Sequence, residues 1–325
     1  MNRRPPRWCG GLLLGVLLAL APACSNPEQP PEDPDGGDPA PARKPYVVFV
    51  VDRSTTMNLP IDTADPDCRT ANNNVCGAPG QDSCDLSRCP TRLSSVQTQL
   101  ELFLASHATQ ARYGMAFFPA TTSGGSTPSE SCRAASQLTV SPPTADESER
   151  LQLSADAVLQ AIRAVPAPAG ATPLGDTLEM VVRETPLGSS AAMAGDVVVV
   201  LTDGLPNCNA DNPYDGTDPR CRCTQIACTG SISRLGCLDL DAPVAVLNGL
   251  RGRGVRTYFL PVGEEVLAGD GPTVFRALSE AGGTLRSCPQ GTNAECGSSY
   301  TCDLSTRRCS GPSLLLGELD RILAP

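Results

Sequence analysis

Two short runs of apolar, mostly β-branched residues, each leading into an aspartate, constrain the fold of this chain more than any other feature. The runs at 47–51 and 197–201 show no polar alternation, which is typical of strands buried on both faces of a parallel sheet. Asp52 follows the first run, and Asp203 follows the second after one threonine. Because ligands bind beyond the carboxyl ends of parallel strands, where strand order reverses, the sequence predicts that both aspartates lie at a binding edge.

Strand and helix patterns alternate along the rest of the chain. Strands are predicted at 46–51, 113–118, 197–201, 255–261 and 284–285, with an antiparallel edge strand at 137–140. Apolar residues at helical spacing predict helices at 93–108, 151–165, 173–183, 242–250, 272–280 and 314–323. This alternation predicts one α/β domain with a mostly parallel central sheet and helices on both faces.

Oxygen-bearing side chains gather in three separated stretches that such a sheet brings to one edge. The stretch 52–56 carries a carboxylate and hydroxyls, the glycine-rich stretch 170–176 carries a threonine, and the stretch 201–204 contains an Asp-Gly turn. Hydroxyls and carboxylates suit hard cations such as magnesium, manganese or calcium. The predicted ligands of one divalent cation are Asp52, Ser54, Thr56, Thr172 and Asp203.

These residues resemble the metal-ion-dependent adhesion site (MIDAS) of the von Willebrand factor type A (VWA) family. The family pattern is an Asp-x-Ser-x-Ser loop after the first strand, a threonine in a Gly-rich loop, and an aspartate opening an Asp-Gly turn after the fourth strand. This chain departs from the pattern at Thr56, which keeps the hydroxyl of the usual serine. The resemblance covers about residues 44–325, with interruptions, and implies a Rossmann-like VWA fold.

The resemblance also implies a mode of binding. In the family the hydroxyls bind the ion directly and the aspartates bind it largely through water, so that a partner's carboxylate completes the shell. We therefore expect magnesium, with manganese or calcium as alternatives, and a protein or peptide ligand that offers a carboxylate. The competing interpretation is that Asp52 and Ser54 only cap a helix and that Asp203 only opens a turn.

The amino terminus has the pattern of an export signal. Three arginines within the first seven residues precede an apolar run at 10–21, and small residues follow it. Residues 1–23 are predicted as a signal peptide, because the apolar run is too short to span a membrane. Cys24 then resembles the lipid-modified first residue of bacterial lipoproteins.

Cysteine parity separates lipidation from ordinary signal cleavage, which cuts the same bond. Of 16 cysteines, Cys9 leaves with the signal and lipidation occupies Cys24, so 14 remain, an even number that permits complete pairing. Ordinary cleavage leaves an odd thiol, so we favour the lipoprotein. Ser25 after the lipidated residue resembles lipoproteins sent outward. The expected location is the cell envelope, at the outer membrane or cell surface rather than the inner membrane.

Residues 24–43 are predicted as a lipid-anchored linker. The segment 25–43 holds six prolines and five acidic residues, a composition that favours a stiff, solvated chain. Without the signal, 22 basic residues face 35 acidic ones, which gives a formal charge of −13. Nucleic acid is therefore excluded as an expected partner.

The remaining cysteines fall in long insertions into the expected VWA domain, at 58–91, 205–241 and 287–311. If the family topology holds, these insertions leave the carboxyl ends of strands and decorate the metal face. The counts predict two self-contained pairs of disulfides, in the first and last insertions, and a six-cysteine group in which Cys132 crosses to the segment 208–237. Disulfide staples are the expected role in an exported chain, with a soft-metal site as the alternative. Acidic loops at 62–67 and 211–218 offer carboxylates for a second calcium ion, but they lack EF-hand spacing, so solvated loops are the expected interpretation.

An enzyme is not expected. His107 is the only histidine, it falls near a helix end, and the chain has neither a Gly-x-Ser-x-Gly elbow nor a His-Glu-x-x-His pair. The sequence thus predicts metal-dependent protein binding or adhesion. One alternative is a structural envelope protein with a vestigial or purely stabilising metal site, and a weaker one is a metal-dependent hydrolase.

Overall fold

The computed structural model describes residues 43–120, 128–189, 195–209, 238–263, 268–296, 301–309 and 316–323. The predicted signal peptide, Cys24 and the linker up to residue 42 lie outside these residues, and the domain boundaries proposed from the sequence stay predictions. None of the helices formed by the described residues is long and apolar enough to cross a membrane.

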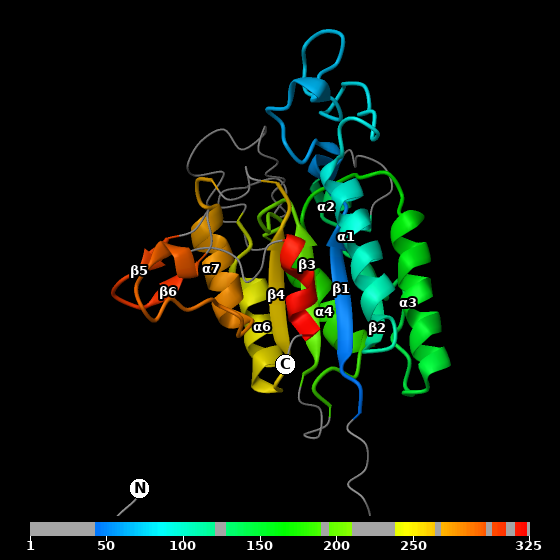
Figure 1. The fold of residues 1–325 in the computed structure, drawn as a ribbon, viewed down its shortest axis with the longest axis vertical. Helices are drawn as coiled ribbons and strands as arrows, with labels where there is room; N and C mark the ends of the chain where they lie inside the picture. The colour runs from blue at the N-terminus through cyan, green and yellow to red at the C-terminus, as the bar shows by residue number, and fades with distance from the viewer. Residues whose placement is uncertain are drawn as a thin grey trace, which may run out of the picture. The chain divides into compact units, whose positions relative to one another are not determined.

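A four-stranded parallel sheet forms the centre of the fold (Figure 1). Its strand order is β2-β1-β3-β4. The bounds are Tyr46–Asp52 for β1, Arg112–Phe118 for β2, Val197–Thr202 for β3 and Arg256–Pro261 for β4. The chain extends from β1 to β2 on one side and then crosses to β3 on the other, so strand order reverses between β1 and β3. The predicted binding edge lies at this reversal.

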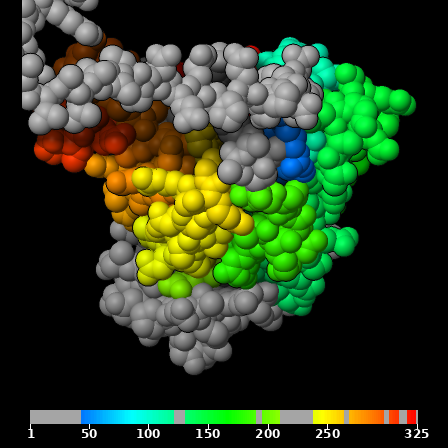
Figure 2. All heavy atoms as spheres, turned by 90° about the horizontal axis from the view of Figure 1, so that it is seen from below, coloured from blue at the N-terminus to red at the C-terminus, as the bar shows by residue number. Residues whose placement is uncertain are grey.

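Helices cover both faces of the sheet, which confirms the predicted fold class. One face packs against α1, α3 and the 3₁₀ helix η5, and the other packs against α4, α6 and α7. Alternate residues of β1 enter opposite cores, so that Phe49 joins the first cluster and Val48 joins the second. Figure 2, which views the sheet from its amino-terminal edge, shows α6 in yellow against the green residues of α4. The bounds are Arg92–His107 for α1, Ser148–Arg163 for α3, Leu174–Glu184 for α4, Asp241–Gly252 for α6, Gly271–Ala281 for α7 and Leu316–Leu323 for η5.

Short elements complete the described part of the chain. They are η1 (Thr55–Asn58), η2 (Pro66–Cys68), α2 (Pro128–Ser131), η4 (Asn293–Glu295), β5 (Cys302–Asp303) and β6 (Arg308–Cys309). The strands β5 and β6 pair antiparallel in a separate two-stranded sheet.

Two predicted strands are not formed. At 137–140 there is a single antiparallel bridge from Val140 to Met115, because the prolines at 142 and 143 follow at once and cannot donate to a ladder. Residues 284–285 form no strand either; the Thr284 hydroxyl instead donates to the carbonyl oxygen of Thr257 at 2.6 Å, directly after a glycine turn.

The last helix differs from its prediction in type. Residues 316–323 are 3₁₀ rather than α-helical, with non-helical backbone angles at Glu318. That side chain bonds Arg286 and Arg321. Leu319 and Ile322 are nevertheless buried in the first core, so the segment covers the sheet as expected. Residues 314 and 315 lie outside the described part.

Disulfides tie the cysteine-rich insertions in the predicted groups. The pairs are Cys68–Cys89, Cys76–Cys84, Cys132–Cys208, Cys288–Cys302 and Cys296–Cys309. The first and last insertions are each self-contained, and Cys132 crosses to the middle insertion, as predicted. Cys221, Cys223, Cys228 and Cys237 lie outside the described residues. Such bonds indicate a chain that folds in an oxidising, extracytoplasmic compartment.

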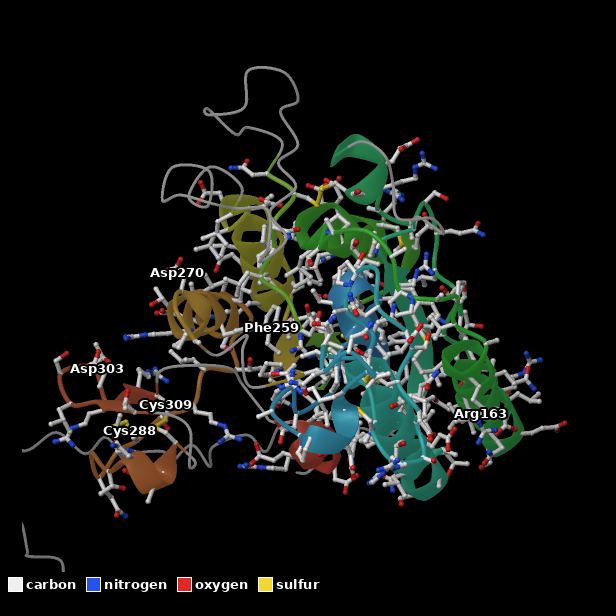
Figure 3. The ribbon with its side chains drawn as sticks, turned by 90° about the horizontal axis from the view of Figure 1, so that it is seen from above. Arg163, Phe259, Asp270, Cys288, Asp303 and Cys309 are labelled. Carbon is white, nitrogen blue, oxygen red and sulfur yellow. A yellow bond between two sulfur atoms is a disulfide. The ribbon has the colours of Figure 1, made fainter. Side chains whose placement is uncertain are left out.

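The described insertions do not all lie over the metal face. Figure 1 places residues 58–91 above the carboxyl ends of the strands, as predicted. The described residues 287–296 and 301–309, called here the cysteine-rich hairpin, lie instead at the flank of the sheet beside α7, where Arg276 contacts Asp303. Figure 3 looks down on the carboxyl ends and shows Cys288, Asp303 and Cys309 to one side of the sheet.

Candidate metal centre

Five side chains predicted from three stretches of sequence lie together at the carboxyl edge of the sheet. We call them the metal centre: Asp52, Ser54, Thr56, Thr172 and Asp203. Because Val51 pairs with Leu201 in the sheet register, the loops that follow β1 and β3 start at the same level. Four of the five residues are buried, and Thr56 is half-buried.

Three oxygen atoms of the metal centre form a compact triangle. Thr56 Oγ1 lies 3.0 Å from Asp203 Oδ1, Ser54 Oγ lies 3.4 Å from the same oxygen, and the two hydroxyl oxygens are 3.3 Å apart. The hydroxyls donate to the carboxylate here. Thr56 and Ser54 belong to the loop after β1. Asp203 follows β3, 147 positions after Thr56 and 149 after Ser54.

Asp52 is held by contacts on both of its oxygens. Its Oδ1 accepts from the backbone N–H of Ser54 at 2.6 Å, and its Oδ2 accepts from the hydroxyl of Thr202 at 2.6 Å. The Thr202 hydroxyl also accepts from the backbone N–H of Gly204 at 3.2 Å. Thr202 thus ties the two aspartate loops together. The sequence prediction missed this residue, although its hydroxyl directly before Asp203 was a visible signal.

Thr172 approaches the metal centre from the loop before α4. Its backbone N–H donates to Asn207 Oδ1 at 2.8 Å, and the N–H of Asn207 donates back to the Thr172 carbonyl at 3.3 Å. A Cβ atom on Gly204 would lie 2.9 Å from Thr172 Oγ1 and 3.9 Å from Asp52 Oδ2. Glycine at this turn therefore permits the close approach of the threonine hydroxyl to the aspartate loops.

A disulfide braces the Thr172 loop. Cys132, Cys208 and Ala171 form a small buried cluster, and the N–H of Ala171 donates to the Ser131 carbonyl at 3.0 Å. The Cys132–Cys208 bond closes a separation of 76 residues. It therefore links the segment after β3 to the segment after β2 immediately beside the metal centre.

Arg92 adds a charge that the sequence motifs do not include. It is the first residue of α1, and its Nη1 donates to Asp203 Oδ2 at 2.7 Å, with both side chains almost fully buried. An arginine at the start of a helix is unfavourable for the helix dipole, which was the only sequence signal of a special role. Asp203 therefore presents Oδ1 to the hydroxyl triangle and Oδ2 to a guanidinium.

Burial controls the protonation of the two aspartates. Removal from water, followed by repulsion from Asp203, raises the pKa of Asp52 to about 8. Removal from water also raises the pKa of Asp203, although the guanidinium of Arg92 and the hydroxyls of Thr56 and Ser54 oppose that shift. Two carboxylates and one guanidinium leave one net negative charge when both acids are ionised. A cation bound here would therefore compete with the proton on Asp52.

The spacing of the oxygens fits a hard divalent cation. Octahedral magnesium binds oxygen at about 2.1 Å, so that neighbouring ligand oxygens are about 3.0 Å apart, and the longer bonds of calcium need a wider spacing. The triangle edges of 3.0, 3.3 and 3.4 Å are hydrogen-bond distances, and they are also compatible with this ligand spacing. Ser54, Thr56 and Asp203 would hold the ion, with Asp52 and Thr172 placed to complete its surroundings.

Other candidate sites are weaker. Cys76, Cys84 and Cys89 cluster closely, as do Cys288, Cys296 and Cys302, but all six form disulfides and offer no thiolate to a soft metal. In the loop 62–67, Asp62 and Asp65 accept from backbone N–H groups two residues ahead, as turn residues do. The loop 211–218 lies outside the described residues.

His107 lies at the opposite end of α1 from the metal centre. Fifteen residues separate it from Arg92, which is about 22 Å along a helix axis. Its ring stacks on Phe103 at 4.7 Å, and its Nδ1 lies 2.9 Å from the Phe103 carbonyl. The ring is therefore part of the packing at the far end of the helix.

Comparisons with known proteins found remote structural similarity. No family model matches the chain, and no curated protein matches it in sequence. A minor pilin PilB variant from Streptococcus sanguinis aligns with a TM-score of 0.45 and 16% identity, over 75% of this chain and 57% of the pilin. Manganese-loaded TRAP protein from Plasmodium vivax aligns with a TM-score of 0.36 and 13% identity, over 71% and 62%.

BatB from Bacteroides thetaiotaomicron aligns with a TM-score of 0.31 and 12% identity, over 67% of this chain and 66% of that protein. Of the PilB variant, the chain spans a little over half the length.

The strand order β2-β1-β3-β4, with helices on both faces, is that of a Rossmann-like, VWA-like fold.

Proposed function

We propose that this chain is an extracytoplasmic lipoprotein that binds a divalent cation at the metal centre and uses it to bind a carboxylate of a protein or peptide ligand. Magnesium is the expected ion, with manganese or calcium as alternatives. The observation that supports the proposal is the triangle formed by Ser54, Thr56 and Asp203, whose oxygens lie close enough together to be ligands of one hard cation.

Incomplete ligation supports a role in adhesion. Hard cations bind six or more oxygens, and the triangle supplies three. Water and an incoming carboxylate would fill further positions, and a carboxylate is the better ligand for a cation whose protein ligands are mainly neutral hydroxyls. The metal centre also lies at the carboxyl edge of the sheet, where the first insertion can contact the same partner.

Anchoring belongs to the same proposal. Residues 1–23 would direct export, lipidated Cys24 would attach the chain to a membrane, and the linker to residue 43 would separate the domain from it. The disulfides support an exported chain. We place the protein in the cell envelope, at the outer membrane or cell surface, and we propose a binding role rather than catalysis.

Calorimetric titration of magnesium, manganese and calcium into the full, oxidised chain tests the metal site. The variant Thr56→Val removes one corner of the triangle without changing the shape of the side chain. We expect saturable binding by the wild type and a loss of affinity of about 10- to 100-fold in the variant, by analogy with the loss of other metal-orienting groups.

Thr98→Val is the matched control, because Thr98 is exposed on α1 and its hydroxyl bonds only the preceding turn among the contacts of the described residues. Its affinity should equal that of the wild type. Equal affinity in Thr56→Val would contradict the proposed ligand set, and absence of binding by the wild type would contradict the metal site.

A structural envelope protein is the second candidate. The buried ion pair between Arg92 and Asp203 favours it, because Arg92 neutralises one carboxylate without any metal. Partner binding that persists in chelator would support this candidate. Turnover that is lost on chelation would instead support the weaker alternative, a hydrolase in which the metal activates water.

A further inference from the structure

Arg92 belongs to none of the three sequence stretches that form the metal centre, yet it is built firmly into it. Its backbone N–H donates to the Leu59 carbonyl at 2.9 Å, which joins the start of α1 to the end of the loop after β1. Its side chain is 1% exposed and contacts a fully buried carboxylate. Burying a guanidinium is costly unless an anion is held close to it, so this contact is a defined part of the site.

The two oxygens of Asp203 have different partners. Oδ1 lies 3.0 Å from Thr56 Oγ1 and 3.4 Å from Ser54 Oγ, whereas Oδ2 lies 2.7 Å from Arg92 Nη1. A metal ion in the triangle would therefore contact Oδ1 of Asp203, while the guanidinium of Arg92 contacts Oδ2. Metal binding does not require Arg92 to leave.

We propose that Arg92 is a resident counter-cation of the metal centre, which holds Asp203 without metal, lowers the affinity for divalent cations, and gives the loaded centre a net positive charge that selects an anionic ligand. This inference rests on the proposed metal-dependent function. Two aspartates and a divalent ion are neutral together, and Arg92 adds one positive charge. One carboxylate from a partner restores neutrality.

Two effects of removing Arg92 oppose each other, and their magnitudes decide the outcome. Loss of a group that orients a metal ligand typically lowers affinity by about 10- to 100-fold. A unit charge within about 8 Å of a divalent ion changes its affinity by more than about a hundredfold at an effective dielectric constant of about 20. Relief of repulsion therefore wins, and we expect metal affinity to rise by about tenfold or more.

The test compares the wild type with Arg92→Met and Arg92→Lys as full, oxidised chains. Methionine keeps an unbranched stem and removes the charge, whereas lysine keeps the charge. Titration with manganese should show binding about tenfold or more tighter in Arg92→Met, and affinity within about threefold of the wild type in Arg92→Lys.

Acetate titrated into each manganese-loaded protein, followed by the water-proton relaxation of the bound ion, measures the effect on an anionic ligand. We expect acetate affinity to fall about tenfold in Arg92→Met and to be retained in Arg92→Lys. A purely structural role of Arg92 would leave acetate affinity unchanged, and that result would overturn the inference.

Thermal melting covers the case in which Arg92→Met is unstable without metal. Saturating manganese should then restore its melting temperature to that of the loaded wild type, and failure to do so would overturn the inference. Manganese binding that is equal to or weaker than in the wild type would overturn the inference and leave the proposed function standing. Absence of manganese binding by all three proteins would overturn both.

Discussion

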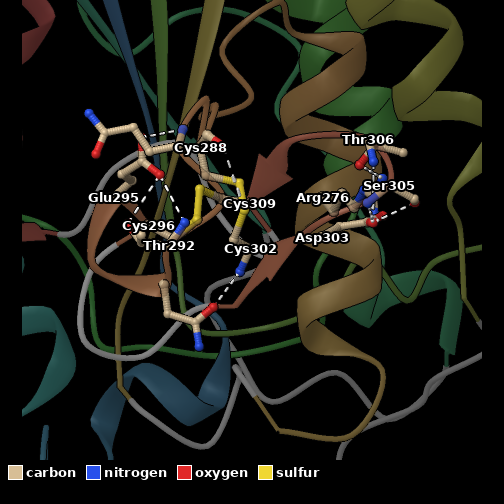
Figure 4. Close-up of a disulfide and its surroundings, with 12 residues drawn as sticks. Arg276, Cys288, Thr292, Glu295, Cys296, Cys302, Asp303, Ser305, Thr306 and Cys309 are labelled. Atoms are coloured by element: carbon tan, nitrogen blue, oxygen red, sulfur yellow. Dashed lines mark hydrogen bonds and ion pairs between the residues drawn. A yellow bond between two sulfur atoms is a disulfide. The ribbon is translucent and has the colours of Figure 1, made fainter.

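The metal centre and the cysteine-rich hairpin each contain an aspartate bonded to an arginine, but their surroundings differ. Asp203 is fully buried beside Arg92, and burial raises its pKa. Asp303 is 31% exposed beside Arg276, and hydrogen bonds from Ser305 and Thr306 lower its pKa (Figure 4). An arginine–aspartate pair therefore carries a large desolvation cost where it is buried, at Asp203, and is an ordinary turn contact where it is exposed, at Asp303.

The two regions also differ in what holds their loops. The metal loops follow β1 and β3, in which every residue is buried. The buried cluster of the hairpin consists of Cys288, Cys296 and Cys309, with Cys302 packed against it. The sheet therefore supports the metal centre through packing, whereas covalent bonds support the hairpin.

The largest expected effect comes from breaking the buried ion pair. Asp203→Ala removes the carboxylate that Arg92 contacts at 2.7 Å, and removing one partner of a buried pair costs about 3–5 kcal/mol. Asp303→Ala is the matched change in the hairpin and should cost much less, because solvent screens this exposed contact. The free energy of unfolding in urea measures both, and equal losses would contradict the comparison.

Removal of a hairpin disulfide should have the next largest effect. The double variant Cys288→Ser with Cys302→Ser opens a loop with a separation of 14 residues, which costs about 3 kcal/mol. Because packing holds the metal centre independently, we expect lost hydrogen-exchange protection to be confined to the hairpin and manganese affinity to be unchanged. Weakened manganese binding in this variant would show that the two regions are coupled.

The smallest effect, taken per pH unit, is a pH dependence specific to the metal centre. Between pH 4 and 8 the folded chain keeps a proton on Asp52 that the unfolded chain releases, because the pKa is raised from 3.8 to about 8. The free energy of unfolding of the metal-free protein should therefore fall as pH rises, by at most about 1.4 kcal/mol per pH unit. The lowered pKa of Asp303 gives no such dependence above about pH 5, since that carboxyl is then ionised in both states.

Melting temperatures at pH 5 and pH 8, with and without saturating magnesium, measure this dependence. Magnesium should stabilise the protein more at pH 8, because the ion replaces the proton. Asp52→Asn should remove most of the slope in the metal-free protein. A flat profile in the metal-free wild type would mean that Asp52 is already ionised at pH 5.

Local patterns in the sequence predicted the central strands of this protein. The apolar runs at 47–51 and 197–201 form β1 and β3 because unbroken β-branched residues suit strands covered on both faces. The positions of Asp52 and Asp203 at the strand ends then follow from the chain itself. The grouping of the disulfides in the first and last insertions was also predictable, because each of these insertions has an even number of closely spaced cysteines.

Tertiary structure decided what the local patterns do not contain. The pairing of Cys68 with Cys89 rather than with a nearer cysteine depends on how the loop folds. Arg92 and Asp203 are 111 residues apart, so only the packing of α1 against the sheet brings them together, and an ion pair depends on distance in space and on burial rather than on spacing along the chain.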